Sequence, residues 1–104
     1  TSRLIVSKFG GSSCGNAEAY RRLGQYFLEQ HKLGHNVVGV FSAMFAVTDR
    51  LLNSIQAAKT GQTDLLAEHR QAIWSLHETT ARELLTDQGN VEESLDWIHS
   101  RLKM

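Results

Sequence analysis

The chain has 104 residues, 41% of them hydrophobic, and its 11 basic side chains balance 11 acidic ones. This length allows one domain, and zero net charge argues against a nucleic-acid-binding or a polybasic membrane-surface protein. A single cysteine excludes an internal disulfide framework and a zinc site of several cysteines. No signal peptide is visible, and no apolar stretch approaches the ~20 residues of a membrane helix, so we expect a soluble cytoplasmic protein.

The first half of the chain alternates strand and helix patterns. Residues 3–8 are a short apolar run that ends at a glycine pair, which predicts a buried strand and a tight turn. Asn16 is a typical helix N-cap, and Gly34 is placed to end that helix. The expected apolar stripe of the helix consists of Tyr20, Leu23, Gly24, Phe27 and Leu28. Residues 36–42 resemble a parallel strand buried on both faces, which completes a βαβ unit with a right-handed crossover.

Helical patterns fill the rest of the chain. A helix that opens near Thr48 is expected to end near Gly61. Its expected inward side chains are Leu51, Leu52, Ile55 and Ala58. The helical period continues over residues 65–85, and Gly89 is expected to break it.

The last helix is predicted from a cap and an apolar stripe. Asn90 followed by Glu93 resembles a capping box, with asparagine in place of serine or threonine. The stripe that follows consists of Val91, Leu95, Ile98 and Leu102. We therefore expect an α/β chain, with a βαβα unit over residues 1–62 and a helical hairpin over residues 63–104. Two strands are too few for a free-standing parallel sheet, so the domain looks incomplete and either continues or is covered by partner chains.

The first of two candidate loops spans residues 8–13, directly after the first strand. Glycines let the backbone approach a bound group, serine hydroxyls donate hydrogen bonds, and Lys8 can neutralise phosphate charge. The spacing matches neither the Walker A motif nor the dinucleotide-binding fingerprint. A tight strand–helix turn with a solvated lysine is the alternative interpretation. Arg21 and Arg22 follow the loop and could approach a nucleotide bound there, but solvated helix charge is the favoured interpretation for them.

The second candidate loop spans residues 42–49 and follows the second strand. Open α/β sheets bind ligands at the carboxyl ends of their strands, so both loops are expected at one edge of the sheet. From the residue types alone, the favoured interpretation is that Thr48 and Asp49 cap a helix.

Together the two loops resemble the start of aspartate kinases, members of the amino-acid kinase superfamily. The resemblance rests on VSKFGGSS, which ends at Ser13, and on SAMFAVTDRLL, which begins at Ser42, and it covers residues 3–55. It implies the parallel sheet of an amino-acid kinase. It also implies ATP-dependent phosphorylation of the aspartate β-carboxylate, which opens lysine, threonine and methionine biosynthesis. The helical remainder fits a helical insertion, and the parent is an aspartate kinase, alone or fused to homoserine dehydrogenase.

The resemblance also assigns roles to residues. Lys8 is matched to the lysine that contacts the ATP phosphates and stabilises the transferring phosphoryl group. The residues matched to the ATP phosphate loop are Lys8, Phe9, Gly10, Gly11, Ser12 and Ser13. Those matched to the aspartate site are Ser42, Ala43 and Thr48. ATP and magnesium are implied as the substrate complex of the parent, with no metal ligand here and no cofactor held tightly by the fragment.

Some features depart from the family pattern. No segment matches the parts that bind adenosine, organise magnesium or contact aspartate through a glutamate, so we expect an inactive fragment. Cys14 replaces an aliphatic residue, and we expect it to pack as a small apolar side chain. Phe45 and Ala46 replace a small pair that often contains glycine, so the phenylalanine either narrows the aspartate pocket or packs against the core.

Histidines and tryptophans in the helical half have simple interpretations. Of the five histidines, His69 and His77 lie two helical turns apart, about 12 Å along the axis, too far to share a metal. We expect exposed or half-buried histidines. Trp74 and Trp97 mark either the meeting of the last two helices or a surface that docks on a missing domain.

A second class of function stays open beside the enzyme fragment. The chain would then be a non-catalytic interaction module that pairs with itself, or with a full-length kinase, through exposed strand edges. In either case we expect a homo-oligomer, with L-aspartate and ATP as the ligands of the parent and no nucleic-acid or membrane partner.

Overall fold

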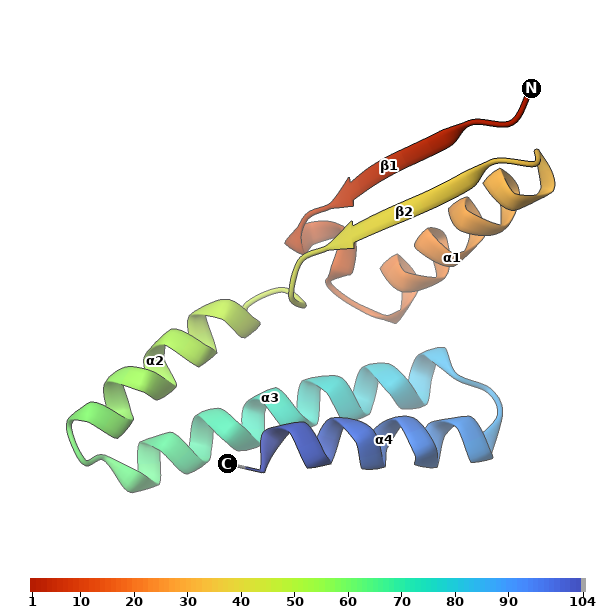
Figure 1. The fold of residues 1–104 in the computed structure, drawn as a ribbon. Helices are drawn as coiled ribbons and strands as arrows, with labels where there is room; N and C mark the ends of the chain where they lie inside the picture. Colours follow the sequence, from red (N-terminus) through yellow and green to blue (C-terminus); the bar gives the residue numbers. More distant parts are fainter. Residues whose placement is uncertain (104) are drawn as a thin grey trace. The chain divides into compact units, whose positions relative to one another are not determined.

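The computed structural model describes residues 1–103. Its elements are β1 (Leu4–Phe9), the 3-10 helix η1 (Gly11–Cys14), α1 (Ala17–Lys32), β2 (Asn36–Phe41), α2 (Val47–Lys59), α3 (Thr63–Leu84) and α4 (Gln88–Leu102) (Figure 1). They confirm a small α/β fold with two parallel strands, consistent with an incomplete domain. The chain divides after Ala46 into two compact units. Within the described part of the chain, no helix has the length and apolar character needed to cross a membrane.

In the first unit, α1 covers one face of a two-stranded parallel sheet (Figure 1). The register runs from Leu4 opposite Asn36 to Phe9 opposite Phe41. On the covered face the Phe9 ring lies 5.2 Å from Phe41 and 5.8 Å from Phe27, measured between ring centroids. A Cβ at Gly39 would lie 2.7 Å from the Phe27 ring, so a side chain at this position would force the aromatic rings to shift.

The ends of α1 follow the sequence. The Asn16 side chain accepts a hydrogen bond from the Ala19 amide at 2.9 Å, which confirms the N-cap. At the other end Gly34 has a φ of 81°, the left-handed conformation that glycine adopts at low cost after a helix. The expected apolar stripe is only partly buried. Leu23 is buried, whereas Gly24 and Leu28 are exposed, because a two-stranded sheet is too narrow to cover the whole stripe.

The other face of the sheet is open, which corrects the expectation that both strands are buried on two sides. Its apolar side chains are all at least half exposed: Leu4 (71%), Val6 (68%), Val38 (50%) and Val40 (50%). Side chains alternate along a strand, so α1 covers only every second residue of β1 and β2. Continuous apolar runs are typical of strands that are covered on both faces of a sheet, whereas the described residues cover only one face.

In the second unit, α2 packs on α3 and α3 packs on α4. The expected inward side chains of α2 are in fact exposed: Leu51 (47%), Leu52 (58%), Ile55 (54%) and Ala58. Ala57 is buried instead, because α2 has a single helical neighbour in this unit. His69 is also buried, contrary to expectation, and an Arg50 N–H donates to its Nδ1 at 3.3 Å.

The hairpin of α3 and α4 holds a small apolar core. The core consists of Ala81, Val91 and Leu95, with Trp74 and Leu85 packed against it. Trp74 thus lies where the two helices meet, whereas Trp97 is 60% exposed. The predicted capping box at Asn90 is wrong. Asp87 is the N-cap and accepts from the Asn90 amide at 3.0 Å, so Gly89 lies in the first turn of α4 rather than breaking the helix.

Candidate functional site

The first candidate loop leaves β1 and turns at once into η1. Lys8 is the last exposed residue of β1 and belongs to the face that α1 leaves uncovered. The Ser13 amide donates to the Gly10 carbonyl at 3.0 Å and closes the turn. Gly10 has φ −79° and ψ 179°, a conformation open to any residue, and a Cβ there would meet nothing within 4 Å. The backbone at Gly10 is therefore accessible to a close-lying ligand.

The second loop begins beside the first. The Ser42 amide donates to the Phe9 carbonyl at 3.0 Å, which ties the exit of β2 to the exit of β1. A Cβ on Gly11 would lie 3.6 Å from the Ser42 Oγ. The Ser42 hydroxyl itself donates to the Ala43 carbonyl at 2.7 Å. Both loops thus meet at the carboxyl edge of the sheet.

Thr48 lies beyond the division between the two units. It is exposed in the first turn of α2, together with Asp49, whose charge complements the positive end of the helix. Ser42 and Ala43 belong to the first unit, so the residues matched to the aspartate site are divided between two compact units.

The junction before α2 carries strain. Ala46 has a φ of 70°, and the left-handed region costs a residue with a Cβ about 1–2 kcal/mol. Phe45, next to it, is 68% exposed and so does not pack against the core. The pair that departs from the family pattern therefore places alanine where the backbone favours glycine.

Cys14, the last residue of η1, anchors the first candidate loop. It is fully buried, as expected for a small apolar role. The Tyr20 hydroxyl shares a hydrogen bond with it, which ties η1 to the first turns of α1. Burial raises the pKa of Tyr20 above its ordinary value, and the neighbouring Cys14 adds to the shift.

Arg22, for which the sequence favoured solvated helix charge, is exposed and lies beside the first candidate loop. Arg22 and both loop serines line a pocket of about 220 Å³; the full lining is Ser12, Ser13, Asn16, Ala19, Arg22 and Leu23. The pocket follows from helical spacing, since residues 16, 19 and 22 follow one another at intervals of three and share a face of α1. Arg21 has a different setting, because its guanidinium lies 3.5 Å from the Glu18 carboxylate.

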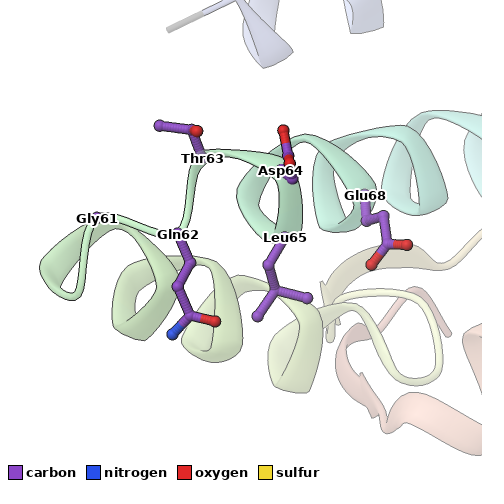
Figure 2. Close-up of a pocket in the computed structure, with 6 residues that line it drawn as sticks. All are labelled: Gly61, Gln62, Thr63, Asp64, Leu65 and Glu68. Atoms are coloured by element: carbon purple, nitrogen blue, oxygen red, sulfur yellow. The ribbon is translucent and has the colours of Figure 1, made fainter.

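A larger hollow, about 520 Å³, lies at the turn from α2 to α3 and contains none of the predicted site residues. In Figure 2, Thr63 and Asp64 point away from Gln62 and Leu65, so the polar groups do not converge on one point. Among residues 1–103, no three His, Cys, Asp or Glu side chains gather as metal ligands. The strand-end loops remain the stronger candidate site.

Comparison with known proteins gives one consistent result. No family model matches the chain. It is 55% identical to the Aspartokinase of Helicobacter pylori (strain J99 / ATCC 700824) over 49 residues, which are 47% of the chain and 12% of that relative. It is 48% identical to the Aspartokinase of Mycolicibacterium smegmatis over 50 residues, 48% of the chain and 12% of the relative. Aspartokinase 2 of Bacillus subtilis matches at 38% over 78 residues, 70% of the chain and 19% of the relative. The chain thus spans less than a fifth of the length of these relatives.

Proposed function

Since the chain is related to the aspartokinases over 47% to 70% of its length, we propose that it is the N-terminal part of an aspartate kinase. The reaction transfers the γ-phosphoryl group of ATP to the β-carboxylate of L-aspartate and yields aspartyl phosphate and ADP. The observation that carries the proposal is the meeting of the two loops. The Ser42 amide donates a hydrogen bond to the Phe9 carbonyl, and the Ser42 side chain lies beside Gly11. We place the parent enzyme in the cytoplasm.

Phosphoryl transfer requires positioning and charge neutralisation more than covalent chemistry. In this segment Lys8 neutralises the negative charge on the ATP phosphates, and that charge shifts during transfer. The open backbone at Gly10 lets N–H groups approach phosphate oxygens, and the hydroxyls of Ser12 and Ser13 add donors in the same loop. The described residues offer no metal-binding cluster, so we assign no magnesium ligand to this segment and route no step through the ion.

On the aspartate side, we assign Ser42, Ala43 and Thr48 to binding of the substrate. Ser42 and Ala43 lie at the exit of β2, and Thr48 begins α2. The segments that bind adenosine and organise magnesium in the family have no match in this chain. The 104 residues alone therefore bind at most part of each substrate, and we expect no turnover from them.

One observation favours a second function, that of an interaction module. Four apolar side chains on the sheet face opposite α1 are at least half exposed, and within residues 1–103 β1 and β2 pair only with each other, which leaves one edge of each strand open. Such a surface favours association with another copy or with further strands. Sedimentation of the chain at rising concentration tests the interaction module, since a monomer at all concentrations argues against self-association through these surfaces.

The test of the kinase proposal is the substitution Lys8→Ala in the natural protein that contains these residues. We expect kcat to fall by about 10²-fold or more, the usual effect of removing one group that stabilises developing charge. Lys32→Ala is the matched control, because Lys32 is exposed in the last turn of the same unit's helix. Equal turnover by both variants and the unchanged enzyme would remove Lys8 from the mechanism.

A further inference from the structure

Tyr26, in the middle of α1, contacts the two residues that flank Lys8 in β1. Its hydroxyl and the hydroxyl of Ser7 share a hydrogen bond of 2.8 Å. Its ring meets the Phe9 ring edge to face, with 5.9 Å between the ring centroids and 72° between the ring planes. All three contacting side chains are half-buried, whereas Lys8 is exposed on the other face of the strand. Tyr26 therefore holds the strand on both sides of Lys8 in the sequence.

These contacts reach Lys8 through the backbone. Successive side chains of a strand point to opposite faces, so a side chain packed on Ser7 and Phe9 does not touch the Lys8 side chain. The three residues share a continuous stretch of strand, and its end is also tied to the second loop. The Phe9 carbonyl accepts a hydrogen bond from the Ser42 amide at 3.0 Å. A shift of this strand end would therefore move Lys8 and the meeting point of the two loops together.

The ring and the hydroxyl of Tyr26 make separable contributions. The ring packs beside Phe9 and Phe27, and its centroid lies 5.6 Å from that of Phe27. A phenylalanine at position 26 would keep this aromatic packing. The hydroxyl adds a directional hydrogen bond to Ser7, the residue directly before Lys8. Removal of the hydroxyl alone therefore tests how the strand end is held without removing its packing.

We propose that Tyr26 is a positioning residue for phosphoryl transfer, and that it acts on Lys8 through the strand residues on either side. The proposal rests on the proposed function, because it requires Lys8 to neutralise charge on the ATP phosphates. The effect of a fixed cation depends on its placement, and a displacement of about 1 Å can lower a rate by about 10²-fold. Tyr26 lies on the covered face of the sheet, so it sets the place of Lys8 without contacting the substrate.

The experiment measures steady-state kinetics of variants of the natural protein that contains these residues, with ATP, magnesium and L-aspartate. Tyr26→Phe should lower kcat about 5-fold, as expected for the loss of one neutral hydrogen bond, and change the KM for aspartate less than about 2-fold. Ser7→Ala removes the other hydroxyl and should lower kcat by a similar factor, whereas Ser7→Thr keeps a hydroxyl and should retain most of the activity. Asp87→Ala is the control, because it removes a helix cap in the other compact unit and should leave kcat unchanged.

Combination with Lys8→Ala separates positioning from a general loss of folding. If Tyr26 acts through Lys8, Tyr26→Phe should have no further effect on kcat in a Lys8→Ala enzyme, because the positioned group is gone. A loss that persists without Lys8 would overturn the proposal, as would full activity of Tyr26→Phe or an equal loss in Asp87→Ala. Unchanged turnover by Lys8→Ala would overturn both the role of Lys8 and this proposal. A large loss in Lys8→Ala with no effect of Tyr26→Phe would overturn this proposal alone and leave the proposed function standing.

Discussion

Replacing Ala46 with glycine should stabilise the chain. Among residues 1–103, Ala46 is the only non-glycine residue with a positive φ, 70°. The left-handed conformation costs alanine about 1–2 kcal/mol, and glycine adopts it freely. Glycine also makes the unfolded chain more flexible, and this lowers the free energy of unfolding by roughly 0.5–1 kcal/mol. The balance is a gain of about 0.8 kcal/mol, which for a chain of this size raises Tm by about 3–6 °C.

The assay is urea and thermal unfolding followed by circular dichroism, with Ala67→Gly as the matched control. Ala67 is exposed inside α3, where glycine should destabilise by about 1 kcal/mol. The two alanine-to-glycine changes therefore have opposite signs, and only the backbone conformation distinguishes them. A loss of stability at Ala46 similar to that at Ala67 would refute the assignment of a strained left-handed residue before α2.

Two further predictions concern the cap of α4 and the half-buried side chain of Tyr20. Asp87→Ala should lower the free energy of unfolding by about 1 kcal/mol, because the Asn90 amide loses its hydrogen-bond acceptor. Asn90→Ala is the control and should change the free energy of unfolding little. Equal effects of the two substitutions would place the cap elsewhere. The pKa of Tyr20 is raised in the folded chain, so the unfolded chain ionises at lower pH. The stabilisation that comes from the neutral hydroxyl is therefore fully present below pH 10 and is lost as the pH rises above it. Tyr20→Phe should flatten this decline between pH 9 and 11, and an unchanged slope would contradict the raised pKa of Tyr20.

Local signals predicted the first unit well. Asn16 and Gly34 bound α1 as expected, because a side-chain cap and a left-handed glycine are decided by residues within one turn. The parallel pairing of the two apolar runs also followed from the sequence. Burial did not, since Leu28 and Ile55 are apolar at helical spacing yet exposed. Which apolar residues are covered depends on neighbouring elements, and a helical pattern alone does not supply them.

The candidate site shows the same division. The meeting of the two loops could be predicted, because parallel strands end at one edge of a sheet. The different settings of Arg21 and Arg22 could not be predicted, because both are arginines in the same helix. Their positions around the helix axis place Arg21 beside Glu18 and Arg22 at the pocket. Asp87 and Asn90 posed a similar choice, because both are good caps and the end of α3 decides between them.

Formation of an acyl phosphate from aspartate is the most direct test of the kinase proposal. The natural protein that contains these residues would be incubated with ATP, magnesium and L-aspartate, and the product trapped with hydroxylamine as the hydroxamate. We predict aspartate-dependent hydroxamate formation that Lys8→Ala reduces about 10²-fold and Lys32→Ala leaves unchanged. Absence of hydroxamate from the unchanged protein, or full product formation by Lys8→Ala, would contradict the account.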